Sequence, residues 1–431
     1  MPEVEPLDVW RILKGAGVKR VKFVVADIAG RPKGLILDID EARDALESGV
    51  YFDGSSIPHY VEVFESDAYA VPDLSSMYVE PTHRAAWAFC FVADPKCAAR
   101  RDPRRLLAEV VEELREKGLE ARVGIEVEFF LVKAEDGGIR PADEGAYFDI
   151  SYSNTALRVA EEIEAAAEQA GLGSSKVHHE VAAGQYEYNI PARDPLRAAD
   201  SLLFFRELAS QVASSHGLRA TFMPKPFWGV NGSGAHVHLS LMRDGVNIFQ
   251  RDGRLSEEGL HCLAGILKYA RVISALAAPT VNSYKRLVPH HEAPTRLVWG
   301  YRNRSALIRV PAYLGKINRI EYRQPDPLMN PYLTFTAMLL ASLRGLEERL
   351  EPPPPVERTA YSLDSAEEIP SNLGEAVSIF EAGYRELGLP REIAEAYVKA
   401  KSREWREYLE ACGPWEETWN KITDWEYRRY L

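Results

Sequence analysis

Three short segments of the sequence place ionisable side chains two residues apart, which is the spacing of one face of a β-strand. They are 124–130 (GIEVEFF), 235–240 (AHVHLS) and 319–323 (RIEYR). In the first segment, Glu126 and Glu128 share one face and apolar residues occupy the other. If both faces of such a sheet are covered, these side chains need charge partners, because a buried carboxylate is not left unpaired. This requirement constrains the fold and the chemistry together.

The polar face of each segment has two interpretations. A solvated face of an antiparallel strand is the simpler one for any single segment. Divalent cations between the strands are the other, and the recurrence of the pattern favours them. The remaining two faces carry His236, His238 and Ser240 in one segment and Arg319, Glu321 and Arg323 in the other.

The segment 178–187 (HHEVAAGQYE) adds two acids, Glu180 and Glu187, around a glycine turn. A donor set rich in glutamate with a minority of imidazole favours Mg²⁺ or Mn²⁺ over zinc. The sequence contains no HExxH pattern, which disfavours a metalloprotease-type zinc site. For His178 and His179, packing in the core is favoured over metal ligation.

Basic side chains are concentrated between residues 285 and 323. Arginine forks match carboxylate and phosphate oxygens, so arginines beside metals indicate phosphoryl transfer. Exposed strand arginines are the alternative. The sequence has no GxxxxGK[ST] loop, and 232–237 fails GxGxxG because Val237 takes the last position. The cluster comprises Lys285, Arg286, Arg296, Arg302, Arg304, Arg309, Lys316, Arg319 and Arg323.

The composition disfavours nucleic-acid-binding, secreted and membrane proteins. The 431 residues include 64 acidic and 52 Lys or Arg residues, a net charge of −12, which disfavours broad nucleic-acid binding. The four cysteines show no CxxC spacing and indicate a reducing compartment. The N-terminus lacks the pattern of a secretory signal, and no apolar run approaches the ~20 residues of a membrane helix. We therefore expect a cytoplasmic protein without a membrane span.

Local signals divide the chain near residue 100. Alternating apolar residues over 21–37 predict a hairpin in a small mixed domain. After it, Asp102 and Pro103 begin a helix that Gly118 ends, and Asn330 caps a helix predicted over 331–350. Near the C-terminus, the spacing of Trp415, Trp419 and Ile422 predicts one helical stripe. That stripe packs either on its own subunit or on a second ring of subunits.

Eight ordered segments resemble type I glutamine synthetase, and the similarity covers nearly the whole chain. The resemblance implies an α+β fold, with a small β-grasp-like N-terminal domain in residues 1–100. It implies a catalytic domain in residues 101–431, built on a curved antiparallel sheet with surrounding helices and a helical C-terminal part. The segments are 52–56, 126–130, 178–181, 220–226, 231–238, 282–289, 303–306 and 319–323.

The resemblance also implies ATP, two to three Mg²⁺ or Mn²⁺ ions, L-glutamate and ammonium as ligands. The first metal would be held by Glu128, Glu180 and Glu187, and the second by Glu126, His236 and Glu321. The glutamate-binding positions would be Asn231, Gly232, Arg286 and Arg323. Nucleotide contacts would be His238, Ser240 and Lys316, and Arg304 and Arg309 would meet the transferred phosphoryl group. Asp53 would be the base for ammonium, with Asp67, Tyr147 and Glu180 completing that site, and Glu292 would close a flap.

Some positions depart from the family pattern. Ser175 and Ile190 replace residues that often contact the nucleotide, and 290–291 is His-His in place of the commoner Gly-Tyr. Glu62 stands where some members carry an arginine used in feedback inhibition, and Tyr361 lies about where a subclass is adenylylated. For Tyr361, an unmodified surface tyrosine is favoured.

The resemblance further implies a homododecamer of two hexameric rings, in which Asp53 reaches the neighbour's active site. Two alternatives to glutamate–ammonia ligation stay open: a γ-glutamyl ligase for a polyamine or another amine, and a catalytically silent assembly. The retention of Asp53, Asp67 and Glu292 favours ammonia as the substrate.

Overall fold

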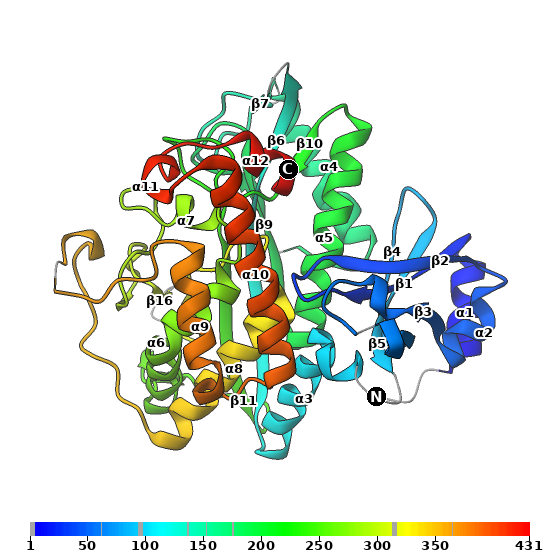
Figure 1. Cartoon of the computed structure of the whole chain (residues 1–431), viewed down its shortest axis with the longest axis horizontal. Coiled ribbons are helices and arrows are strands. Elements are labelled where there is room, and N and C mark those ends of the chain that lie inside the picture. Colours follow the sequence, from blue (N-terminus) through cyan, green and yellow to red (C-terminus); the bar gives the residue numbers. More distant parts are fainter. Residues whose placement is uncertain are drawn as a thin grey trace.

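Two β-sheets organise the chain (Figure 1). The structure is a computed structural model, which describes residues 5–61, 63–93, 98–135, 138–151, 153–174, 176–312, 317–363 and 365–431. Within these residues, one sheet has five strands and lies in the N-terminal part, and the other has ten and spans most of the remainder. Helices cover the larger sheet, so the predicted α+β class is confirmed.

The small sheet has the strand order β2-β1-β5-β4-β3. Strands β1 and β2 form the predicted antiparallel hairpin, and β1 pairs in parallel with β5. Its strands are β1 (Arg20–Ala26), β2 (Pro32–Asp38), β3 (Val50–Asp53), β4 (Asp67–Val79) and β5 (Ala85–Ala93). Its helices are α1 (Pro6–Gly15) and α2 (Ala42–Ser48), with short 3-10 turns at Gly54–Ser56 and Val63–Glu65.

The two faces of β1 belong to different cores. Val21 and Phe23 pack in a cluster of their own with α1 and α2, whereas Val24 joins the core of the catalytic part. Gly30, in the hairpin turn, has a φ of +77°, and a Cβ there would lie 2.6 Å from the Cα of Asn330. The small sheet is thus held tightly against the rest, and a domain boundary near residue 100 stays a prediction.

Helix α3 (Pro103–Glu116) begins as predicted. The Asp102 side chain accepts a hydrogen bond from the backbone N–H of Arg104 at 2.9 Å, and Pro103 occupies the first turn. The apolar side chains on one face of the helix are buried, and Gly118 follows the helix with a φ of +71°. The capping residue and the stop residue therefore mark both ends of this helix as predicted.

Arg104 joins helix α3 to β4 and to helix α5 (Pro195–Ser215). Its side chain is fully buried, and its guanidinium donates to Asp200 at 3.1 and 2.9 Å and to Asp73 at 2.7 Å. Asp200 also accepts hydrogen bonds from Ser76 and Tyr332. Burial opposes the charge of Arg104, but Asp200 outweighs that effect and raises the pKa of the guanidinium.

We expect Arg104→Met to lower the free energy of unfolding by about 3 to 5 kcal/mol, because the buried carboxylate of Asp200 loses its cation. Urea unfolding followed by circular dichroism would measure the change. Arg115→Met is the matched control, since Arg115 pairs with Glu112 and Asp194 on the surface and should contribute under about 1 kcal/mol. Equal unfolding midpoints for the two variants would contradict the prediction.

The large sheet runs in the order β15-β16-β17-β11-β6-β9-β8. Its pairs are antiparallel except β15–β16, which is parallel, so the sheet predicted as antiparallel is slightly mixed. Its main strands are β6 (Glu120–Glu135), β8 (Val177–His179), β9 (Gln185–Arg193), β11 (Ala235–Arg243), β15 (Trp299–Tyr301), β16 (Ile308–Val310) and β17 (Ile320–Tyr322). Short strands β7 (Gly138–Pro141) and β10 (Arg219–Thr221) pair with the C-terminal end of β6, and β12 (Val246–Asn247) pairs with that of β11. Strands β13 (Gln250–Arg251) and β14 (Arg254–Leu255) form a separate hairpin.

Long helices complete the catalytic part. Helix α8 (Pro331–Glu348) begins at the predicted cap, where Asn330 accepts from the backbone N–H of Tyr332 at 3.1 Å, and ends two residues before the predicted Leu350. The other helices are α4 (Thr155–Gln169), α5 (Pro195–Ser215), α6 (Glu257–Ala277), α7 (Ser283–Arg286), α9 (Leu373–Leu387) and α10 (Arg391–Cys412), with 3-10 turns at Ala98–Arg101 and Ala360–Ser362.

Helix α6 is the one described helix with the length and apolar composition of a membrane span. Its sequence contains no long apolar run, because Lys268 and Arg271 interrupt it. Most of α6 is buried against α8 and α9, as in the core helix of a globular protein.

The prediction that Trp415, Trp419 and Ile422 form one helical stripe is wrong. Trp415 begins the short helix α11 (Trp415–Thr418), whereas Ile422 precedes a separate helix, α12 (Asp424–Tyr430). The break has a physical cause, since Thr423 and Glu426 form a capping box that starts α12 anew. Trp415 packs on the aromatic side chains of α10, and the tail lies on its own chain (Figure 1).

Candidate active site

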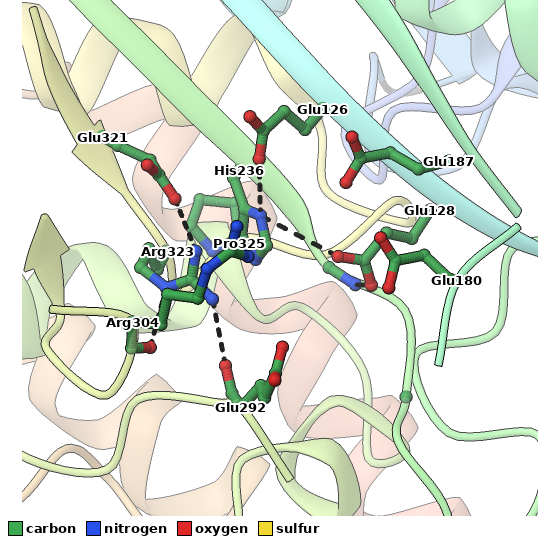
Figure 2. Close-up of polar contacts among 12 residues, drawn as sticks. Glu126, Glu128, Glu180, Glu187, His236, Glu292, Arg304, Glu321, Arg323 and Pro325 are labelled. Carbon is green, nitrogen blue, oxygen red and sulfur yellow. Dashed lines mark hydrogen bonds and ion pairs between the residues drawn. The ribbon is translucent and has the colours of Figure 1, made fainter. Parts of the chain in front are cut away.

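The large sheet brings the predicted polar faces into register (Figure 2). His236 of β11 lies opposite Glu126 of β6, and Glu128 lies opposite Glu187 of β9. On the other side of β11, His238 lies opposite Glu321 of β17. Between these residues, the alternate positions of β6 are buried in the hydrophobic core. Both faces of the strands are therefore covered, which excludes the solvated-face interpretation.

Among the residues that the structure describes, two groups of side chains offer ligand atoms within 4.8 Å of one another. They are Glu126, Glu187 and His236, and His178, Glu180 and Glu187. Within the first group, Nδ1 of His236 lies 3.0 Å from a carboxylate oxygen of Glu126. Oxygen donors dominate both groups, which suits Mg²⁺ or Mn²⁺. Glu187 is common to the two groups.

These groups differ in part from the ligand sets that the resemblance implied. Glu128 lies beside them, where its carboxylate accepts from the backbone N–H of Gly234 at 2.7 Å and from Gln185 at 3.3 Å. Glu321 is fully buried and pairs with Arg323 and Arg309 at 2.5 Å each. His178, expected to be a packed histidine, lies 2.9 Å from Glu180 and has one ring nitrogen without a hydrogen-bond partner.

The electrostatics indicate a site built for cations. Burial, followed by the charges of Glu180 and Glu187, raises the pKa of Glu128 well above its ordinary value. Burial and Glu126 raise the pKa of Glu187. Burial also lowers the pKa of His236 to about 4, so its imidazole is neutral and available as a ligand at neutral pH. Crowded carboxylates of this kind are stabilised when a divalent cation neutralises them.

We expect Mg²⁺ to stabilise the protein more at pH 8 than at pH 5.5. Glu128 and Glu187 have raised pKa values when folded, so the stability they contribute is present below the ordinary value of 4.5 and lost as the pH rises through the raised values. Mg²⁺ binds the deprotonated form, so its affinity grows over the same interval. Thermal unfolding with and without Mg²⁺ at both pH values would measure this. Glu128→Gln should reduce the difference, and equal Mg²⁺ effects at both pH values would contradict the expectation.

Arginines and a loop close the other side of the carboxylate cluster. Arg323 is buried, and it donates to the backbone carbonyl of Glu292 at 3.2 Å and to that of Arg304 at 3.0 Å. Glu292 has a left-handed backbone, with a φ of +55°. One cavity gathers most of the predicted site, and it is lined by Glu128, Glu180, Gln185, Glu187, Asn231, Gly232, His236, Arg286, His291, Glu292, Arg304 and Arg323.

Two of these lining residues were missed from the sequence. Gln185 is buried, and its amide donates to Glu128 and, at 3.1 Å, to the carbonyl of Gly232. It stands two residues before Glu187 on the same strand, so the period-two argument could have found it. His291 lines the cavity from the loop before Glu292, at a position noted only as a departure from the family pattern.

The predicted nucleotide positions lie along the neighbouring strands. His238 contacts Glu126 at 3.0 Å and accepts from Arg319, and Ser240 follows on the same strand. Arg309 on β16 pairs with Glu321. Ile190 is buried in the hydrophobic core, so it does not face a ligand. Lys316, Ser175 and Glu62 lie outside the described residues.

The predicted ammonium site is divided. Asp53 and Asp67 face each other at the ends of β3 and β4, are exposed, and do not line the cavity of their own chain. Tyr147 is 45% exposed, and its ring lies 5.8 Å from that of His178, next to Glu180. One chain therefore supplies the two halves of this site at separate places.

A carboxylate cluster that suits divalent cations, beside arginines that suit phosphate oxygens, is typical of a metal-dependent enzyme that transfers a phosphoryl group. Residues 17–95 match the glutamine synthetase beta-Grasp domain, and residues 100–420 match the glutamine synthetase catalytic domain. The chain belongs to the glutamine synthetase family.

Similar proteins include glutamine synthetases of three archaea. That of Pyrococcus horikoshii is 40% identical over 97% of both chains. Those of Pyrococcus abyssi (39% identical, 96% of both chains) and Methanocaldococcus jannaschii (40% identical, 97% of this chain and 96% of the relative) are similar to nearly the same degree. Among solved structures, an ADP complex of GmaS superposes with a TM-score of 0.87 at 31% identity, over 98% of this chain and 99% of that one.

Proposed function

We propose that this protein joins ammonia to the γ-carboxylate of L-glutamate, with ATP, through a γ-glutamyl phosphate intermediate. The products are L-glutamine, ADP and phosphate. One observation carries the proposal: a single cavity contains a cluster of carboxylates on one side and Arg286, Arg304 and Arg323 on the other. A cation-binding half beside an anion-binding half suits a reaction between two anions, glutamate and ATP.

We assign the first metal to Glu128, Glu180 and Glu187 and the second to Glu126, His236 and Glu321. The buried carboxylates with raised pKa values and the neutral His236 fit this assignment. When bound, two to three Mg²⁺ or Mn²⁺ ions would offset the negative charge of the phosphates. Glu187 lies within reach of both clusters.

The arginines orient the two anionic reactants. Arg286, with Asn231 and Gly232 beside it, binds L-glutamate, and Arg323 holds the loop that carries Glu292. Arg304 and Arg309 meet the phosphoryl group as a glutamate oxygen attacks the γ-phosphate of ATP. His238, Ser240 and Lys316 contact the nucleotide. Glu292 closes over the acyl phosphate and excludes water, which would hydrolyse it.

Asp53 takes the proton from ammonium, with Asp67, Tyr147 and Glu180 around the cation. Hydrogen bonds from Ser55 and Ser56 lower the pKa of Asp53, so its carboxylate is anionic at neutral pH and attracts ammonium. Because Asp53 lies outside the cavity of its own chain, we assign it to the site of a neighbour in a ring. We place the enzyme in the cytoplasm as a dodecamer of two hexameric rings.

The test compares three amines as substrates. Phosphate release from ATP should depend on L-glutamate and be fastest with ammonium, with methylamine and putrescine at least about tenfold slower in kcat/KM. Glutamine should be the product by mass spectrometry. A preference for methylamine or putrescine would identify a γ-glutamyl ligase for another amine, and no amine-dependent release would indicate a silent assembly.

A further inference from the structure

The C-terminal helix α12 lies against the two segments that form the glutamate side of the cavity. One is the loop 224–233, which carries Asn231 and Gly232, and the other is 281–287, which includes α7 and carries Arg286. Three residues of α12 contact these segments. These contacts are hydrogen bonds and an ion pair, whereas apolar contacts alone would be enough to pack a terminal helix.

Glu426 lies at the centre of this contact. It is fully buried, and one carboxylate oxygen accepts from the Asn282 amide at 2.7 Å while the other accepts from the Lys285 ammonium at 2.6 Å. Lys285 is also fully buried, and it directly precedes Arg286 in α7. Glu426 therefore fixes both ends of the short segment that presents the arginine.

Asn282 extends the connection to the second segment. Its side chain accepts from the backbone N–H of Lys225 at 2.7 Å and donates to the carbonyl of the same residue at 2.9 Å. The loop that begins there is closed by a bond from the N–H of Ser233 to the carbonyl of Pro224 at 2.8 Å. A Cβ at Gly232 would lie 2.1 Å from that carbonyl oxygen, so the two ends of the loop approach too closely for any side chain at position 232.

Two tyrosines of α12 form hydrogen bonds with the backbone of the same two segments. The Tyr427 hydroxyl donates to the carbonyl of Pro226 at 2.8 Å, and the Tyr430 hydroxyl accepts from the N–H of Val281 at 3.3 Å. The same helix thus binds the backbone of both segments directly and also connects them through Glu426.

Lys285 has further partners from the C-terminal part. Its ammonium donates to the Tyr408 hydroxyl at 3.1 Å and to the carbonyl of Lys421 at 2.7 Å, and it lies over the rings of Tyr408 and Trp415. Helices α10, α11 and α12 therefore all meet on one side chain beside Arg286. A buried ammonium held this way is a fixed point, because moving it would break charge-assisted hydrogen bonds.

We propose that Glu426 is a positioning residue for the glutamate pocket, and that α12 is part of the substrate-binding structure. Glu426 holds Arg286 and the loop of Asn231 and Gly232 at a fixed separation, through Lys285 and Asn282. The inference rests on the proposed function, because it takes this pocket to bind L-glutamate.

The first test is kinetic. Glu426→Gln in the full-length enzyme should raise the KM for glutamate about tenfold or more, with the KM for ATP within about twofold of the parent value. Glu80→Gln is the matched control: Glu80 is equally buried and paired with Lys22, but it directly follows β4 of the small sheet and should leave both KM values unchanged. Adding Lys285→Met to Glu426→Gln should recover part of the loss, since no unpaired ammonium then remains.

The second test does not depend on activity. Hydrogen exchange of the backbone amides in 224–233 and 281–287 should be about tenfold faster in Glu426→Gln than in Glu80→Gln. Tyr427→Phe, which removes one hydrogen bond only, should give a smaller change in the same direction if Glu426→Gln does not fold. The inference is overturned if exchange in these segments is unchanged, or if the KM values for glutamate and ATP rise together. A parent enzyme without glutamate-dependent phosphate release, but with faster exchange in Glu426→Gln, would refute the proposed function and leave the positioning role supported.

Discussion

Glu187→Gln is expected to lower kcat/KM for glutamine formation about a thousandfold, a loss of about 4 kcal/mol of transition-state stabilisation. The reason is its position: Glu187 belongs to both groups of candidate metal ligands, with Glu126 and His236 on one side and His178 and Glu180 on the other. Losing one charge there weakens both cation sites at once. Calorimetric titration with Mg²⁺ or Mn²⁺ should show weaker binding at more than one site.

The neighbouring carboxylates provide the comparison. Glu128→Ala should mainly weaken the use of glutamate and ammonium, and Glu126→Ala should mainly weaken the use of nucleotide, because these two side chains are assigned to different metals. Glu135→Gln, an exposed position on the same strand, is the control and should be without effect. Normal activity of Glu187→Gln at limiting Mg²⁺ would refute a role of Glu187 in metal binding.

Much of the fold could be predicted because local signals and packing agree. The period of two in β6 and β11 predicted which side chains share a face, and the register then placed His236 against Glu126. Caps predicted the starts of α3 and α8 to the residue. Where such a signal was overlooked, as with the capping box of Thr423 and Glu426, one helix was predicted in place of two.

The rest of the site depends on an uncharged residue and on contacts between distant segments. The period of two in β9 places Gln185 on the face of Glu187, but a pattern of ionisable pairs does not include its amide, which joins Glu128 to Gly232. The contact between Glu426 and Lys285 joins residues 141 positions apart, and only the folded chain brings them together. Buried polar groups of this kind are specified by their partners, so sequence spacing alone cannot assign them.

Subunit complementation should show that Asp53 serves a neighbouring chain. Asp53 lies on β3, the edge strand of the small sheet, away from the cavity of its own chain. Large apolar side chains near it are exposed, with Phe64 at 82% and Tyr51 at 53%, which is typical of a surface that another subunit covers. In the head-to-tail ring that we propose, we expect this edge to lie against the next subunit's cavity.

Asp53→Ala alone is expected to lower kcat/KM for ammonium at least a hundredfold while leaving ATP binding nearly unchanged, because the ammonium site loses its base. Glu321→Ala should also be inactive, but because it removes a ligand from the metal and arginine side of the cavity. Subunits of the two variants, dissociated together and reassembled in equal amounts, should regain about a quarter of the parent activity, because about one site in four then combines two intact halves. A mixture of Glu128→Ala and Glu321→Ala is the control: both changes lie in the same half, so no intact site can form. Mixed rings verified by mass spectrometry that show no more activity than this control would refute a site shared between subunits.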